Sequence, residues 1–555
     1  VEIAKTTNTS LQATVDEADT LNSTLESNIT TATNKNKSLV DNLTTVDSKN
    51  STLTTTINNA NTAEGNLSTT IDTATSKNTT LNNTIKTGTT LNTNLSNKIT
   101  EGNQVLSDLN TAIQGSDLSS LNANVTDLLH RSVVVGTISE LTTAISNIGR
   151  SGYSGSILMK AGTYTPTSSF ELPAYTSIRP LGDGKVTIKC NNASINNVFR
   201  NKLSGTETGY NGAGYITIEG ITFEGSKTTN TITPVAFAHA RGCAVSKCRF
   251  QNFNRWHNIE LNGCNFCYIK NNEFKNYGNT DSSNATEVIQ LDYCGNSEVY
   301  PWTCKYDNTV CKNIYIEENS FDNIIGAGIG NHSFLTNIFI DNLHVKKNVF
   351  TNCTHAVYIG NINNLYFNEN HCEKCQFGVE VKEGRGQGIS GFTFRENYFY
   401  GLKGTTGYTN KDVENRFIRI ECLNEDSMQV CSGIKILYNT IKNCNSHGVG
   451  IFGNNVECIG SMITNCGKIG IFFYCVQVGR IDSNICQDNG SYNQGWRNYD
   501  IAVGGYSGNR NCWRVGVANN SADSICGLNG CTNSNYAIGN TVDCTNVNGG
   551  AMVQK

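Results

Sequence analysis

A short motif recurs along the 555-residue chain from Tyr215 onward, mostly at intervals of 20 to 30 residues. Each copy has alternating apolar residues followed by N-x-Φ-x-N-Φ, where Φ is apolar, as in "CYIKNNEFKNY", "IYIEENSFDNI" and "IKILYNTIKNC". In the clearest copies the first Asn is Asn272, Asn319, Asn348 or Asn439, and the second is Asn276, Asn323, Asn352 or Asn443. Short strands with one Asn-bearing turn per repeat are typical of a solenoid of stacked coils.

We therefore predict an all-β fold, a right-handed parallel β-helix. Like residues of successive coils would stack at the strand spacing of ~4.8 Å, and the Asn amides would form hydrogen-bonded ladders inside a turn. A propeller or a sandwich would need hairpin turns such as Asn-Gly at regular short spacing, and these turns are sparse here.

A short amphipathic helix is expected at the start of this region. The stretch "TISELTTAISNIG" opens with a capping box from Thr137 to Glu140. Its apolar residues fall on one helical face, namely Leu141, Ile145 and Ile148. Residues 136–190 are thus expected to form the helix-capped start of the β-helix, and residues 191–555 its body.

Residues 1–114 carry a different repeat, with a period of 14 residues. The repeat is marked by Leu11, Leu25, Leu39, Leu53, Leu67, Leu81, Leu95 and Leu109. Four residues after each Leu stands another aliphatic residue such as Val15, and a later core position is usually Asn, as at Asn22. This 4-3 spacing predicts a long N-terminal α-helical coiled coil. Because the intervening Thr, Asn and Ser are poor helix formers, the helix would need association with other copies.

Asn residues in the core of a coiled coil lower its stability but fix its register and its number of helices. Asn or Ile at heptad position a, with Leu at heptad position d, favours a dimer. The alternative is a disordered Thr/Asn-rich linker. Gly115 breaks the pattern, and residues 115–135 are expected to be a neck. Since the repeat is already running by Leu11, we expect the chain to start inside a longer polypeptide, after an attachment domain.

Composition excludes some partners. The 42 basic and 46 acidic side chains nearly balance, which gives no electrostatic case for nucleic acid or a membrane surface. No apolar run approaches the ~20 residues that span a bilayer, and no secretory signal pattern opens the chain. We therefore expect neither a nucleic-acid nor a membrane partner.

The cysteines fit a reduced core. None of the 22 precedes Cys190, and four fall at one repeat position and should stack inside, namely Cys353, Cys375, Cys444 and Cys466. There are two CxxC pairs, Cys264 with Cys267 and Cys372 with Cys375, but the second lies in that stacking position, so we expect no metal and no cofactor. Reduced thiols fit assembly in a cytosol.

A candidate site follows from aligning "HNIELN" with "EVIQLD" of the next coil. Ile259 and Leu261 would point inward beside Ile289 and Leu291. The outward pairs would then be Glu260 with Gln290 and Asn262 with Asp292. The same columns continue with Tyr358, Glu380 and Arg419, and with Lys382 and Glu421. Such a lining of carboxylates, amides, a Tyr and cations suits a long polar polymer such as a polysaccharide.

Glu260 and Asp292 form a diagonal pair on adjacent coils, with Cα atoms about 8 Å apart by strand geometry. Carboxylate separations of ~5 to 9 Å serve both retaining and inverting glycoside hydrolysis. The alternative is a solvated charged face without a function. His257 and Glu287 would neighbour each other at the edge of this patch, where His257 has either a structural role at the corner or a supporting catalytic one.

An insertion at residues 293–313 would stand over this strand. It carries four aromatic residues suited to stacking on sugar rings, namely Tyr293, Tyr300, Trp302 and Tyr306. The alternative is a loop that covers the sheet edge with its own small aromatic core.

The stretches "HNIELNGCNFCYIKNNEF", "EVIQLDY" and "PWTCKYDNTVCKNIYIEENSF" resemble the pectate-lyase-like β-helix region of tail fibre, tailspike and appendage proteins in phages of Gram-positive bacteria. The resemblance spans about residues 136–555 and is strongest in 215–325. It implies a homotrimer rather than a dimer, joined to phage baseplate or tail proteins on its N-terminal side. It also implies a virion protein, made in the host cytoplasm, that binds host surface glycans such as capsule or wall teichoic acid and sometimes cleaves them.

By this resemblance, the carbohydrate site would include His257, Glu260, Glu287, Gln290 and Asp292. The sequence departs from polygalacturonase-like enzymes, because "NTD" at 279–281 precedes a strand and "SHG" at 446–448 lacks the first Gly. It also has no evident calcium-binding Asp cluster with a catalytic Arg, so pectin chemistry is disfavoured. Polysaccharide depolymerase, non-catalytic binder and purely structural fibre all stay open, as does a bacterial surface enzyme, which the missing signal and free thiols disfavour.

Overall fold

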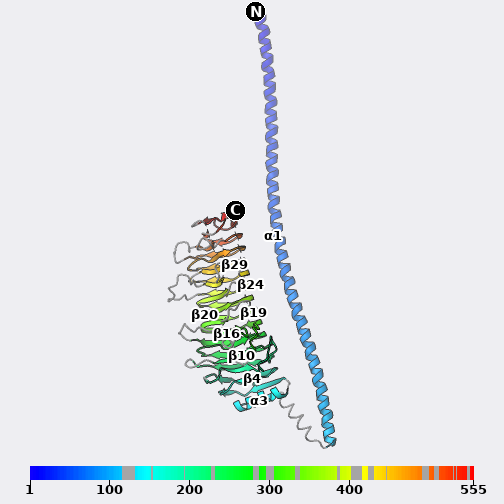
Figure 1. Cartoon of the computed structure of the whole chain (residues 1–555). Helices are drawn as coiled ribbons and strands as arrows, with labels where there is room; N and C mark the ends of the chain where they lie inside the picture. Colours follow the sequence, from blue (N-terminus) through cyan, green and yellow to red (C-terminus); the bar gives the residue numbers. More distant parts are fainter. Residues whose placement is uncertain are drawn as a thin grey trace. The chain divides into compact units, whose positions relative to one another are not determined.

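The computed structural model describes residues 1–115, 132–151, 154–192, 194–226, 232–278, 287–295, 305–331, 338–383, 388–401, 416–422, 431–445, 447–490, 499–504, 512–528, 531–532, 534–546 and 550–554 (Figure 1). The chain divides into two units, Val1–Leu121 and Asn122–Lys555. Within the described residues, no helix is both long and apolar enough to cross a membrane.

The first unit is one helix, α1 (Glu2–Gly115). Threonine hydroxyls along it donate to the carbonyl oxygen four residues earlier, for example Thr6 to Glu2 and Thr69 to Gly65. This bonding satisfies the hydroxyls inside a helix that threonine does not favour. The predicted core positions are open in the single chain, where Leu25 and Leu81 are each 56% exposed. The helix is confirmed, and its association into a coiled coil stays a prediction.

The second unit begins with β1 (Ser132–Val135) and α3 (Ile138–Ser151). The capping box is confirmed: the Thr137 amide donates to Glu140 Oε2, and the Glu140 amide donates to Thr137 Oγ1, each at 3.1 Å. The predicted apolar face of the helix is buried. Because β1 pairs in parallel with β2, the sheet starts inside the segment predicted as a neck.

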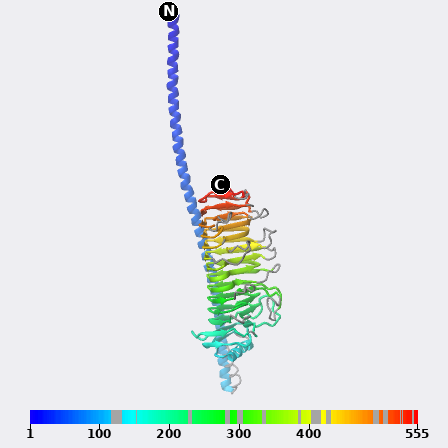
Figure 2. The same cartoon turned by 90° about the vertical axis from the view of Figure 1, so that its left-hand side faces the viewer.

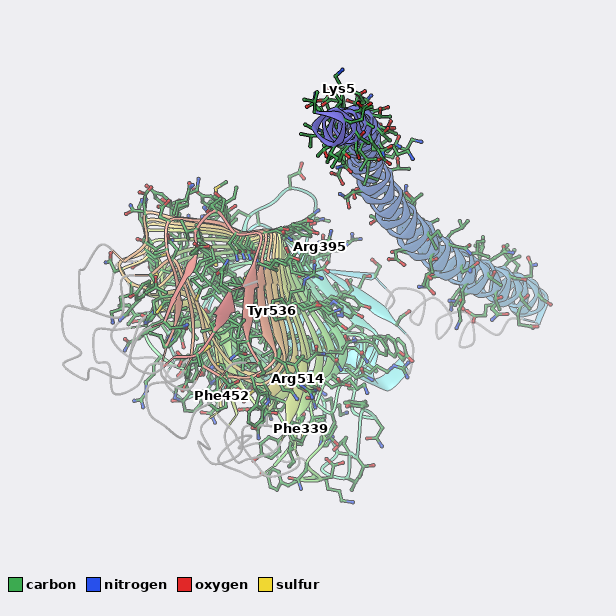
Figure 3. The ribbon with its side chains drawn as sticks, turned by 90° about the horizontal axis from the view of Figure 1, so that it is seen from above. Lys5, Phe339, Arg395, Phe452, Arg514 and Tyr536 are labelled. Atoms are coloured by element: carbon green, nitrogen blue, oxygen red, sulfur yellow. The ribbon has the colours of Figure 1, made fainter. Side chains whose placement is uncertain are left out.

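The remaining strands form three parallel ladders, one for each face of a coil, and successive coils lie over one another (Figures 2 and 3). Ladder 1 contains β1, β2 (Gly155–Met159), β5 (Thr176–Pro180), β8 (Thr217–Glu219), β11 (Ala244–Ser246), β14 (Asn265–Lys270), β17 (Lys312–Glu317), β19 (Ile340–Lys346), β21 (Ile362–Asn368), β24 (Ile389–Arg395), β27 (Cys431–Leu437), β29 (His447–Ile459), β32 (Gly479–Asp482), β35 (Val515–Ala518), β38 (Tyr536–Ile538) and β40 (Val553–Gln554).

Ladder 2 contains β3 (Gly162–Tyr164), β6 (Val186–Lys189), β9 (Ile221–Glu224), β12 (Arg249–Gln251), β15 (Glu273–Tyr277), β18 (Ser320–Gly330), β20 (Val349–Gly360), β22 (His371–Glu373), β25 (Tyr398–Tyr400), β28 (Thr440–Lys442), β30 (Met462–Thr464), β33 (Ile485–Gln487) and β36 (Ser521–Ala522). Ladder 3 contains β4 (Phe170–Leu172), β7 (Asn197–Asn201), β10 (Thr233–Ala238), β13 (Ile259–Asn262), β16 (Glu287–Asp292), the long strands β18, β20 and β29, β23 (Phe377–Glu383), β26 (Arg416–Cys422), β31 (Ile471–Val476), β34 (Ile501–Val503), β37 (Ile525–Gly527) and β39 (Cys544–Asn546).

Asparagine ladders hold the turns, as the motif predicted. Inside the turn after ladder 1, each Asn donates from Nδ2 to the Oδ1 of the next at 2.8–3.1 Å, through Asn272, Asn319, Asn348, Asn370, Asn397 and Asn439. The second Asn of the motif adopts the left-handed conformation on the outside, with φ of 53° at Asn276 and 58° at Asn323. Asn tolerates this conformation better than most residues, which explains its recurrence at this turn.

Aromatic and thiol side chains fill the interior of the coils. Neighbouring rings stack at 4.6–5.0 Å between centroids through Phe223, Phe250, Phe274, Phe321 and Phe350. The predicted cysteine position is confirmed, because Tyr277 pairs with Ile324 and Ile324 with Cys353, and all four predicted cysteines are buried. No disulfide joins the cysteine side chains that the structure describes. No described cluster of three or more His, Cys, Asp or Glu side chains is placed to hold a metal ion.

Candidate functional site

Ladder 3 brings the two predicted site strands side by side. β13 pairs with β16 in parallel, and the residue partners are Ile259 with Ile289, Glu260 with Gln290, Leu261 with Leu291 and Asn262 with Asp292. The predicted register is therefore confirmed residue by residue.

Glu260 and Asp292 each accept a hydrogen bond from a side-chain amide on their own strand. Asn262 Nδ2 donates to Glu260 Oε1 at 2.9 Å, and Gln290 Nε2 donates to Asp292 Oδ2. Carboxylates and amides thus alternate both along a strand and between strands. The two carboxylates face each other only diagonally, with Cα atoms about 8 Å apart by strand geometry. This arrangement separates two negative charges and gives each of them a donor.

His257 and Glu287 lie together at the edge of this cluster, as the alignment predicted. His257 Nδ1 is 2.7 Å from the main-chain oxygen of Glu287 and 3.9 Å from its Oε2. The Tyr277 hydroxyl donates to the same main-chain oxygen at 3.2 Å. The shorter contact of His257 is to the main chain of Glu287. Such a contact is expected of a residue with a structural role at the turn before the strand.

Gly330 of β18 makes room for the Glu287 side chain. A Cβ at this position would lie 2.6 Å from Glu287 Cγ and 2.3 Å from the main-chain oxygen of Tyr358. Gly330 is also the strand partner of Gln290. A larger residue at 330 would therefore clash with the Glu287 side chain.

The cluster is buried, in contrast to the expected open groove. Glu260 is 5% exposed, and Asn262, Gln290 and Asp292 are at most 1% exposed. The alternative of a solvated charged face is therefore wrong for these four residues. Burying ionised carboxylates is costly unless they are hydrogen bonded, which explains why each has an amide donor.

Part of the cover comes from the residues after β16. Tyr293 is 4% exposed, and Cys294 packs with Ala236 and Ala238 of β10 against Leu203. These small side chains alternate with inward-facing residues of β10, so they belong to its outer face. The alternation of residues along one strand does not predict this cover, because Cys294 packs against residues that are distant in sequence.

The base of the 293–313 insertion is fixed to the body by His239. Its Nδ1 and Nε2 lie 2.8 Å from the main-chain oxygens of Gly209 and Lys305, respectively. A neutral imidazole has only one N–H, so donating to both oxygens requires the imidazolium form. No periodic signal in the sequence marks this residue, which follows the end of β10.

Asp307 completes the anchor. It accepts hydrogen bonds from the Gly209 amide at 2.8 Å and from the Thr309 hydroxyl at 2.6 Å. Burial raises the pKa of Asp307, but the hydrogen bonds from Thr309 and Gly209 outweigh it, so the pKa lies below its usual value. His239 also lowers the pKa through its charge. The base of the insertion is thus held by hydrogen bonds to Gly209 and not only by packing.

The predicted columns continue along ladder 3. Gln290 pairs with Gly330, Gly330 with Tyr358, Tyr358 with Glu380 and Glu380 with Arg419. Tyr358 thus lies two coils from Gln290, with the glycine between them. Lys382 pairs with Glu421 as expected, but these side chains and that of Arg419 lie outside the described residues.

The structure describes two of the four aromatic residues of the insertion. Tyr293 is buried against the strand, whereas Tyr306 is 42% exposed. Tyr300 and Trp302 lie outside the described residues.

A second histidine on ladder 3, His355, contacts a carboxylate of the next coil. Its Nε2 lies 3.1 Å from Glu380 Oε2, and its ring stacks on Phe377 with centroids 4.3 Å apart. His355 lies in the same column as Glu287, because Glu287 pairs with Ala327 and Ala327 with His355. Glu380 lies on the next coil, on β23, where Phe377 is the strand partner of His355.

Comparison with solved structures shows the β-helix fold. The tailspike protein of E. coli bacteriophage HK620, solved in complex with a pentasaccharide, aligns with a TM-score of 0.50 and 14% identity over 76% of this chain and 75% of that one. The surface adhesin PfbA of Streptococcus pneumoniae aligns with a TM-score of 0.41 and 13% identity over 74% of this chain and 89% of that one. No protein-family model and no curated protein sequence matches the chain. The right-handed parallel β-helix, preceded by a long helix, is the fold of this protein.

Proposed function

We propose that the chain is the receptor-binding part of a phage tail fibre or tailspike, and that the outer face of ladder 3 recognises a host surface polysaccharide. The observation that carries the proposal is the alternating array of Glu260, Asn262, Gln290 and Asp292 on adjacent coils. A stabilising core does not need such an array, since apolar residues of similar size would avoid the cost of burying charge. The fold shared with a tailspike that binds a pentasaccharide is consistent with this function.

Within this site, Glu260 and Asp292 are the proposed acid and base, or nucleophile, of glycoside hydrolysis. One carboxyl protonates the leaving oxygen, and the other activates water or attacks the sugar. Glu287 and His257 support them. The side chains proposed to contact sugar are Gln290, Asn262, Tyr293, Tyr300, Trp302, Tyr306, Tyr358 and Glu380.

Burial favours a second candidate, a binder that does not cleave. Because Glu260 and Asp292 are at most 5% exposed, substrate would reach them only after Tyr293 and its neighbours move. A glycan could instead bind over Tyr358 and Tyr306, which are more open. The host polysaccharide, capsule or wall teichoic acid, would then be recognised without hydrolysis.

We further propose that the stalk forms a homotrimer that attaches to baseplate or tail proteins on its N-terminal side. The stripe of exposed leucine and isoleucine along α1 is consistent with association. A purely structural fibre would have the stalk without the glycan site.

The test is incubation of the purified full chain with isolated host wall and capsule glycans, with mass spectrometry of soluble oligosaccharides. Glu260→Gln and Asp292→Asn preserve side-chain size and remove the acid or base. Release by the wild type that both folded variants abolish is the expected result. Binding without release would leave the non-cleaving adhesin, and neither binding nor release would reduce the protein to a structural fibre.

A further inference from the structure

A histidine and carboxylate pair lies on ladder 3 apart from the carboxylate and amide cluster. His355 Nε2 is 3.1 Å from Glu380 Oε2. The two side chains differ in access, since that of Glu380 is 4% exposed and that of His355 is 18% exposed. Glu380 pairs with Tyr358 and lies three coils from Gln290, or about 14 Å at the strand spacing. A polymer lying along the ladder would pass both places.

The contact fixes the tautomer of His355. An ionised carboxylate only accepts hydrogen bonds, so the proton is on Nε2 and the lone pair is on Nδ1. In the described part of the chain, Nδ1 of His355 has no hydrogen-bond partner. The imidazole is therefore oriented by a buried carboxylate and has a basic nitrogen on its more open side, which is the arrangement of a general base.

Aromatic rings set the position of the imidazole. Phe377 stacks on it at an angle of 7°, and the Tyr358 ring lies 5.1 Å away at 60°. Stacking on Phe377 fixes the ring plane, and the Tyr358 phenol can supply a hydrogen-bond donor beside it. The described contacts of His355 include no serine or cysteine side chain, so water would be the nucleophile.

Another histidine and glutamate pair shows that this geometry is not general in the protein. His371 Nε2 is 3.6 Å from Glu373 Oε2 on ladder 2, and the two side chains are 41% and 33% exposed. Such an open pair is solvated and only weakly oriented. His371 thus provides a matched control of the same residue types.

We propose that His355, Glu380 and Tyr358 form a second catalytic site, which removes O-acyl groups from the polysaccharide bound on ladder 3. This proposal rests on the proposed glycan-binding function. Imidazole is an effective base near neutral pH, and base-activated water attacks an acyl carbonyl, whereas glycosidic cleavage needs a strong acid for its leaving group.

In the reaction, His355 Nδ1 takes a proton from water, and the oxygen of that water forms a bond to the acyl carbon. The Tyr358 hydroxyl donates a hydrogen bond to the carbonyl oxygen as negative charge develops. The bond from the acyl carbon to the sugar oxygen then breaks, and His355 returns its proton to that oxygen. Ester and water are converted to a carboxylic acid and a free sugar hydroxyl.

The test uses the full chain with 4-nitrophenyl acetate and with partially O-acetylated glucomannan, whose acetate release is followed by NMR. His355→Gln is expected to lower the rate by about 10²-fold or more. Glu380→Gln is expected to lower kcat more than it raises KM, because it removes the carboxylate that orients the imidazole and leaves sugar binding in place. His371→Gln should leave both kcat and KM unchanged.

Equal hydrolysis by the wild type and His355→Gln, including none by either, would overturn the proposal. So would a loss in His355→Gln that His371→Gln shares. If His355→Gln unfolds, as judged by its thermal transition, the kcat of folded Glu380→Gln decides the question, and a kcat equal to that of the wild type would overturn the proposal. The proposed depolymerase activity is measured separately, as a fall in the chain length of the host glycan by size-exclusion chromatography. Deacylation breaks no glycosidic bond and leaves this chain length unchanged.

Discussion

Replacing Asn348 with Ala removes the middle of the asparagine ladder. The Asn348 Nδ2 donates to the main-chain oxygen of Ile316 at 2.8 Å and to Asn370 Oδ1 at 3.1 Å. Its Oδ1 accepts from the amide and the Nδ2 of Asn319, both at 3.0 Å. All of these groups lie in the interior, where water cannot replace Asn348.

The expected magnitude follows from what is left unpaired. The amide of Asn319 loses its acceptor, and an orphaned buried N–H costs about 1–3 kcal/mol. The other lost hydrogen bonds add about 2 kcal/mol together. The free energy of unfolding should therefore fall by about 3–5 kcal/mol.

A matched control is available on the outside of the same turn. Asn323 has a φ of 58°, and its Nδ2 donates to Asn276 Oδ1 at 2.9 Å in an exposed position. Asn323→Gly keeps the left-handed conformation and should cost less than about 1 kcal/mol. Denaturant unfolding and hydrogen exchange at the Asn319 amide measure the two variants. Equal destabilisation by both, or an Asn319 amide that stays protected in Asn348→Ala, would refute the reasoning.

Three further predictions concern the site and the stalk. Gly330→Ala should destabilise the fold by about 1–3 kcal/mol and weaken glycan binding, because the new Cβ would displace Glu287. Thermal unfolding measures the stability and calorimetry measures the binding. Unchanged binding would contradict the role of Glu287. The anchor made by Asp307 should be complete above the usual aspartate pKa of about 3.9 and be lost as the pH falls through its lowered pKa. Hydrogen exchange of the insertion base, corrected for the intrinsic effect of pH, should show this step in the wild type and lose it in Asp307→Asn. Residues 1–121 should form trimers by analytical ultracentrifugation, and replacing the core residues Asn22 and Asn36 with Ile should raise their thermal stability and broaden the oligomeric state; a monomer would refute the stalk prediction.

The scaffold could be predicted from the sequence because its interactions repeat. The N-x-Φ-x-N-Φ motif predicts the ladder through Asn319 and Asn348, since each coil presents the same amide to the next. The same periodicity fixes the register of Glu260 with Gln290. A shift by one residue would expose Ile259 and Ile289, so only one register buries the apolar side chains.

The environment of the site could not be predicted in the same way. Part of the cover over Glu260 and Asp292 comes from Cys294, which packs with Ala236 and Ala238 of another coil. The contact of His355 with Glu380 joins side chains that are not strand partners, since His355 pairs with Phe377. Periodicity gives positions on a face, whereas cover and side-chain partners depend on segments that do not repeat.

The most direct test of the glycan-binding proposal is a cryo-EM structure of the full chain with oligosaccharides prepared from the host cell surface. The account predicts sugar density on the outer face of ladder 3, in contact with Tyr358 and extending toward Gln290. Sugar density confined to ladder 1 or ladder 2, or no bound sugar at saturating concentration, would contradict it.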